Sequence, residues 1–195
     1  PGLGICCRCH RLDGCFGRSE SASVRRQLYE PADLFSEALR AGQWWRLFSH
    51  PFVHLTWYHL LLDAGAFFIL YTGLQEKRVI CKLTIAFACS GFSLIAALCF
   101  TPDIEAKGLC GLSGIAHGLM AHSGLELIHT RKRIWVGLFS FLLVFIKSIY
   151  EFITGEVVFT FMHMGLCGSP LAACHLGGVM GGILSFFIFC RRNYR

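Results

Sequence analysis

Five long apolar segments with few charged residues restrict this chain more than any other feature. They cover residues 54–73, 79–100, 112–128, 134–154 and 171–190. Each has roughly the 17 to 25 residues that a helix needs to cross a bilayer. The sequence therefore predicts an all-α fold, a polytopic membrane helical bundle in which five spans are visible.

The charge distribution agrees with a membrane protein. Only 15% of the 195 residues are charged, whereas a soluble domain carries about 25%. The formal net charge of +6 is clustered beside the apolar segments, which is typical of membrane topology rather than of nucleic-acid binding. We therefore expect the lipid bilayer to surround the chain, and we expect no nucleic-acid partner.

Basic clusters predict the orientation of the spans. They follow the first, third and fifth segments and contain Lys77, Arg78, Lys82, Arg131, Lys132, Arg133, Arg191, Arg192 and Arg195. The positive-inside rule places these clusters in the cytoplasm. The starts of the same segments then face the other side of the membrane. Four polar residues near those starts are expected at a similar depth: His54, His59, Ser113 and His175.

The chain divides into a polar leader over 1–41, rich in cysteine and arginine, and a membrane domain over 42–195. A short amphipathic helix is expected over 31–42. Five spans with a cytoplasmic C-terminus would leave 1–53 outside, yet its arginines resist translocation. We therefore expect one further span upstream. The cysteines at 6–15 leave zinc binding open, but no second cluster completes a zinc module.

Ser113 is the first candidate for chemistry. It lies between Gly111 and Gly114 at the head of the third segment. Glycines permit unusual backbone angles at a turn into a helix, and backbone amides beside such a serine can bind an oxyanion. The glycines also suit plain helix packing, because Gly114 and Gly118 have the spacing of close helix contacts. The pattern alone leaves both interpretations open.

His175 heads the fifth segment and precedes two pairs of glycines, Gly177–Gly181 and Gly178–Gly182. These pairs form two faces of small residues, which allow close approach of another helix, including the one that carries Ser113. A base must come within about 3 Å of the hydroxyl that it activates. Since no third, carboxylate member is obvious, the pattern favours a Ser–His dyad over a triad.

Further polar residues interrupt the apolar segments. His54, His59 and Asp63 can line an oxyanion hole or form an internal network that satisfies itself. Lys147 and Glu151 lie four residues apart, either as a functional pair supporting the substrate site or as a mutually neutralised polar face. A histidine metal site is a further alternative, but no closely spaced ligand pair anchors it. Its members would be His50, His54, His59, His117, His163 and His175.

At this point the sequence resembles the rhomboid intramembrane serine proteases over roughly residues 42–190. The matching pieces, in order, are Trp45-Arg46, the run HLTWYHLLLD over 54–63, GLSG over 111–114 and HLGGVMGG over 175–182. No single piece is specific, but the four in this order are. The resemblance implies a six-helix core whose first helix is missing here, and cleavage of transmembrane substrates near the outer membrane surface.

The resemblance also assigns roles to residues. Ser113 would be the nucleophile and His175 the general base, while His54 and the Ser113 amide would line the oxyanion hole, with His59 in the same polar cluster. Rhomboids usually have Asn at the position of Asp63, and an ionised aspartate cannot donate a hydrogen bond to an oxyanion. This departure raises the alternative of a catalytically silent relative that binds transmembrane clients.

A second departure points to a subfamily. Rhomboids commonly place a tyrosine at the position of His117, stacked on the catalytic histidine. The stretch GLSGIAHGLM over 111–120, together with Lys147 and Glu151, is similar to the bacterial rhombosortases. These relatives process proteins that end in Gly-Gly, an apolar helix and a basic tail.

The rhombosortase resemblance implies a serine endopeptidase without a metal or cofactor. It would lie in the bacterial inner membrane, with its site toward the extracytoplasmic side. Its partners would be transmembrane protein substrates, and a lipid-linked amine could accept the new C-terminus in competition with water.

Overall fold

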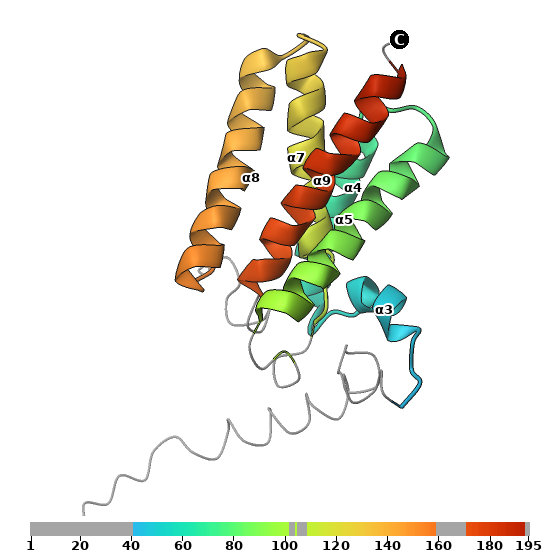
Figure 1. The fold of residues 1–195 in the computed structure, drawn as a ribbon, viewed down its shortest axis with the longest axis vertical. Coiled ribbons are helices and arrows are strands. Elements are labelled where there is room, and N and C mark those ends of the chain that lie inside the picture. Colours follow the sequence, from blue (N-terminus) through green and yellow to red (C-terminus); the bar gives the residue numbers. More distant parts are fainter. Residues whose placement is uncertain (1–40, 102–103, 105–108, 159–170, 194–195) are drawn as a thin grey trace, which may run out of the picture. The chain divides into compact units, whose positions relative to one another are not determined.

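Five long helices make up most of the described chain, as Figure 1 shows. The computed structural model describes residues 41–101, 104, 109–158 and 171–193. Within these residues the chain is helical and contains no strand. All but the last residue of the predicted leader, and all but the last two residues of the helix expected over 31–42, lie outside the described residues. The long helices are α4 (Trp57–Gly73), α5 (Val79–Phe100), α7 (Ser113–His129), α8 (Ile134–Thr154) and α9 (Ala172–Asn193).

The five predicted segments are confirmed as helices. Two of them, α5 and α8, have the predicted bounds, and the others differ by one to three residues at an end. The largest difference at a start is in α4, which begins at Trp57 because Thr56 caps it. The backbone of Thr56 is extended and its hydroxyl accepts a hydrogen bond from the His59 N–H at 3.1 Å. Before α4, the chain forms the short helix α3 (Arg46–Ser49) and the 3-10 turn η1 (His50–Phe52).

Fewer helices than five satisfy a membrane-span criterion by length and composition. Among the described residues, α5, α8 and the part of α9 over Ala172–Phe189 do so individually. The segment Arg46–Phe52 and α4 pass together as a pair bent by 97°, which would make a fourth span. The predicted third span, α7, has only 17 residues, of which eight are buried. It contacts α4, α5, α8 and α9, so its small and polar residues face protein rather than lipid.

Glycines bring α9 close to α7, as the sequence predicted, and also close to α5. On one face, a Cβ at Gly178 would overlap the Gly114 carbonyl, and a Cβ at Gly182 would overlap the Gly118 carbonyl. On the other face, Gly177 and Gly181 lie against the backbone of α5. Helix packing is therefore one role of the glycines near Ser113, and it brings α7 and α9 into backbone contact.

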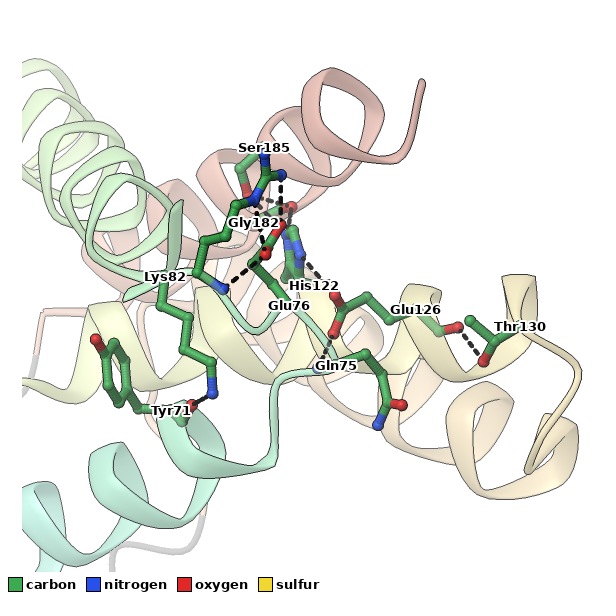
Figure 2. Close-up of polar contacts among 10 residues, drawn as sticks. Tyr71, Gln75, Glu76, Lys82, His122, Glu126, Thr130, Gly182 and Ser185 are labelled. Atoms are coloured by element: carbon green, nitrogen blue, oxygen red, sulfur yellow. Dashed lines mark hydrogen bonds and ion pairs between the residues drawn. The ribbon is translucent and has the colours of Figure 1, made fainter. Parts of the chain in front are cut away.

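A buried polar cluster joins the far part of α7 to α9 and to the end of α4 (Figure 2). His122 Nδ1 lies 2.9 Å from Ser185 Oγ, which itself donates to the Gly182 carbonyl at 2.8 Å, and the His122 and Ser185 side chains are buried. Glu126 Oε1 lies 3.6 Å from His122 Nε2, while its Oε2 accepts from the Gln75 N–H at 3.0 Å. This cluster was not predicted from the sequence. It lies about 13 Å along α7 from Ser113, because each helical residue rises 1.5 Å.

Candidate active site

Ser113 begins α7 directly after a turn that only glycine suits. Gly111 has φ +93°, in the region that side chains rarely adopt. A Cβ at this position would lie 2.6 Å from Asp63 Oδ2 and 3.0 Å from His59 Nε2. The Gly111 N–H donates to the His50 carbonyl at 3.2 Å. The turn is thus held against α4 and η1, and it places the serine at the N-terminus of a helix.

The structure brings the predicted nucleophile and base together. His175 lies in the first turn of α9, 62 residues after Ser113, and its Nε2 is 3.2 Å from Ser113 Oγ. The His175 ring is buried, whereas Ser113 is partly exposed. This separation is hydrogen-bonding distance, and it follows from the glycine contacts that draw α9 onto α7 one turn further along.

A carboxylate lies at the other ring nitrogen of His175. Glu151 Oε2, from α8, is 2.7 Å from His175 Nδ1. Its Oε1 is 2.7 Å from Lys147 Nζ and accepts from the Val158 N–H at 2.9 Å. The sequence favoured a dyad because the spacing of Lys147 and Glu151 reveals their pairing but not the helix that they face. A Ser–His–Glu arrangement is present in the structure.

His117 lies against one face of the His175 ring. Its ring stacks on that of His175, with centroids 4.0 Å apart and planes 7° apart. This is the stacking position that the resemblance assigns to a tyrosine. His117 Nδ1 is 2.7 Å from the Ser113 carbonyl, and Nε2 is 2.8 Å from Lys147 Nζ. A carbonyl only accepts and an ammonium only donates, so the neutral Nδ1–H form fits both contacts.

Three of these side chains could also hold a metal ion. The ligand atoms of His117, Glu151 and His175 all lie within 4.8 Å of one another. The Lys147 ammonium contacts two of the three residues, at 2.8 Å and 2.7 Å. A side-chain cation thus supplies positive charge where an ion would supply it. The other histidines of the metal hypothesis are not in this group, and His163 lies outside the described residues.

Asp63 supports the turn before Ser113. Its Oδ2 accepts a hydrogen bond from the Leu112 N–H at 2.8 Å. His59 Nε2 and His54 Nε2 lie 3.3 Å and 3.5 Å from the same oxygen. The carboxylate therefore faces a backbone donor and two imidazoles. His54, His59, Asp63 and Gly111 form one group at this turn, adjoining the group of Ser113, His175, Glu151, Lys147 and His117.

Replacing Asp63 tests this supporting role. Alanine would leave the buried Leu112 N–H without its acceptor, at a cost of about 1–3 kcal/mol, whereas the oxygen of asparagine can still accept. We expect Asp63→Ala to slow the reaction of Ser113 with a fluorophosphonate by roughly tenfold or more, and Asp63→Asn to retain most of the rate. The measurement is the labelling rate of both variants in detergent, and equal rates for alanine and wild type would contradict it.

Comparison with known proteins supports the assignment of the fold. The sequence matches the Rhomboid domain over residues 41–192. This range includes every described helix except the last residue of α9, Asn193. No curated protein and no solved structure matches the chain. The domain and the apolar helices identify an integral membrane protein. The match covers most of the sequence, and the chain belongs to the rhomboid family, whose members are generally intramembrane serine proteases.

Proposed function

We propose that this rhomboid is an active serine endopeptidase that cleaves the transmembrane or C-terminal anchor segment of membrane-tethered proteins. The observation that carries the proposal is the 3.2 Å separation between Ser113 Oγ and His175 Nε2. The turn at Gly111 supports it, because it presents the serine at a helix N-terminus. The N–H groups of a first helical turn have no partner inside the helix and can bind developing negative charge.

In the proposed reaction, His175 Nε2 takes the Ser113 proton while Oγ attacks the carbonyl carbon of the substrate. The carbon–nitrogen bond then breaks, and the leaving amine takes that proton from His175. The product is an ester between Ser113 and the new C-terminus. Water or an amine attacks this ester, again with His175 as the base, and restores the serine. No step requires a metal or an organic cofactor.

The finer proposal concerns substrate and location. The sequence similarity over 111–120, with Lys147 and Glu151, supports rhombosortase-type processing of Gly-Gly C-terminal signals. The acyl acceptor would then be either water or a lipid-linked amine. The basic clusters favour an active site on the extracytoplasmic side of the bacterial inner membrane. Asp63, with a carboxylate where rhomboids usually have an amide, favours the rival candidate, a silent relative that binds transmembrane clients.

Labelling with a fluorophosphonate serine probe in detergent distinguishes these two candidates. We expect the wild-type chain to be labelled and Ser113→Ala and His175→Ala to lose the label. Ser185→Ala is a matched control, because Ser185 also bonds a histidine at 2.9 Å but is buried; its labelling should equal that of wild type. A folded wild-type chain without label would support the silent relative, and undiminished labelling of His175→Ala would contradict the role of the base.

A further inference from the structure

Glu151 is a buried carboxylate that contacts an ammonium group, a backbone N–H and an imidazole nitrogen. Its side chain is 0% exposed. Oε2 faces His175 Nδ1, while Oε1 faces Lys147 Nζ and the Val158 N–H. Two donors already occupy Oε1, so a proton on the carboxyl group would have to lie on Oε2, facing His175 Nδ1. The imidazole is a stronger base than a carboxylate, so a proton between these two atoms belongs on the ring. The contacts therefore fit the ionised form, with the Lys147 ammonium as its counter-charge.

These contacts also determine where His175 carries its proton. A ring nitrogen 2.7 Å from a carboxylate oxygen donates to it, so the proton lies on Nδ1. The lone pair then lies on Nε2, facing Ser113 Oγ at 3.2 Å. This is the tautomer that a general base needs, because only a free lone pair can accept the serine proton.

We propose that Glu151 is the third member of a Ser113–His175–Glu151 triad. It acts as a positioning residue, which fixes the tautomer and the orientation of His175, and Lys147 keeps it charged. This inference rests on the proposed protease function and goes beyond the Ser–His dyad, because it places α8 in the active site.

Glu151 would matter most when His175 becomes charged. As the serine attacks, its proton bonds to Nε2, while the Nδ1 proton remains on the ring and Glu151 remains ionised. The new imidazolium then lies 2.7 Å from a carboxylate oxygen, in a buried site where such pairing is strong. Lys147 carries the same sign of charge, but it contacts Oε1 rather than Oε2. The carboxylate thus serves both cations through separate oxygens.

His117 completes a closed ring of contacts around the base. It accepts from Lys147, donates to the Ser113 carbonyl and stacks on His175. The ring of contacts runs from Ser113 through His175, Glu151, Lys147 and His117 back to Ser113. The His175 ring is thus held at Nδ1, at Nε2 and across one face. Rotation of the imidazole would break both hydrogen bonds and the stacking together.

Glu151→Gln tests the triad, because an amide cannot accept from every donor around it. Its NH2 group must face either His175 Nδ1 or the other two donors, Lys147 Nζ and the Val158 N–H. In the first case His175 is driven to the tautomer with a proton on Nε2, which cannot act as the base. The equivalent carboxylate-to-amide change in serine proteases of another fold lowers kcat about 10⁴-fold. We expect the maximal rate of fluorophosphonate labelling to fall at least about 10³-fold, with little change in the half-saturating probe concentration.

The tautomer of His175 is a second readout, and it would not change if Glu151 had only a structural role. In ¹⁵N-histidine NMR spectra, with His175 assigned by its loss in His175→Ala, we expect Nδ1 to be protonated in wild type. In Glu151→Gln the Nε2-protonated form should replace it or mix with it. Ser148→Ala is the matched control on α8. Ser148 is fully buried, and its hydroxyl has no hydrogen-bond partner among the described residues. In Ser148→Ala, the His175 tautomer and the labelling rate should therefore match those of wild type.

A double variant serves as the control for misfolding. Glu151→Gln alone leaves the Lys147 ammonium without its counter-charge, whereas Lys147→Gln with Glu151→Gln removes both charges together. We expect the same loss of labelling in the double variant at a retained unfolding temperature. Wild-type labelling rates with an unchanged His175 tautomer, in either folded variant, would overturn the triad and leave the protease function standing. If wild type itself is unlabelled, the protease function fails, while the NMR spectra still report whether Glu151 sets the tautomer.

Discussion

Ser113→Ala is expected to lower the cleavage rate of a membrane-embedded substrate by at least about 10⁴-fold, the scale seen when a serine nucleophile is removed. The substrate is a reporter that ends in Gly-Gly, an apolar helix and a basic tail, reconstituted with the enzyme in liposomes. Alanine preserves the close contacts of α7 but removes the atom that forms the acyl-enzyme. His175→Ala and the double variant should lose about as much as Ser113→Ala alone, because the two residues act as a unit.

Mass spectrometry of the reporter products checks this expectation. A free carboxylate at the new C-terminus would indicate transfer to water, and an amide to an added amine would indicate aminolysis. Ser185→Ala serves as the control for removal of a buried hydroxyl that bonds a histidine. Cleavage by Ser113→Ala at the wild-type rate would contradict the assignment of the nucleophile.

Gly178→Ala is expected to have the largest effect on the fold. A Cβ at Gly178 would overlap the Gly114 carbonyl oxygen and lie 2.7 Å from its carbon. Because the obstacle is backbone rather than a flexible side chain, α7 and α9 must move apart. Overpacking of this kind costs about 1–3 kcal/mol or more, and a displacement of about 1 Å at the site costs about 10²-fold in rate. We expect a lower unfolding temperature in detergent and roughly 10²-fold slower fluorophosphonate labelling.

Gly91→Ala is the matched control for that variant. Gly91 is also within a helix, and a Cβ there would meet nothing within 4 Å. Alanine should therefore leave the unfolding temperature unchanged or slightly higher, since it is the better helix former. Equal behaviour of Gly178→Ala and Gly91→Ala would show that the α7–α9 contact is looser than the structure has it.

The helices were predictable because a long apolar segment has few alternatives in a bilayer. The bounds of α5 and α8 follow directly from the apolar segments that charged residues and Gly155 delimit. The glycine spacing on α9 also predicted close packing on α7, since four-residue spacing places small residues on one face. Among the described residues, three of the five predicted spans meet a span criterion individually, and α4 meets it together with the bent segment before it. The third segment, α7, does not meet it because this helix has 17 residues and packs against four other helices, and burial in protein relaxes the need for lipid-facing apolar residues.

The site was only partly predictable for a related reason. Ser113 and His175 lie beside glycines that mark a turn and a close helix contact, so the local sequence was enough to predict that these two residues come together. The partner of Glu151 depends on how α8 packs against α9, which no local pattern encodes. The contact between His122 and Ser185 spans 63 residues. The spacing of His122 and Glu126, four residues apart, was the one signal for this cluster, and nothing in the sequence indicated Ser185.

Two serine–histidine contacts join α7 to α9, and the second contact has its serine and its histidine on the opposite helices from the first. Near the start of α7, the serine is on α7 and the histidine on α9; further along, the histidine is on α7 and the serine on α9. Between the two contacts, backbone meets backbone at the glycines. A slip of one helix along the other by a single residue, about 1.5 Å, would break both contacts at once. We therefore expect a change in bilayer thickness to tilt this helix pair as one body, while the distance between Ser113 Oγ and His175 Nε2 stays the same.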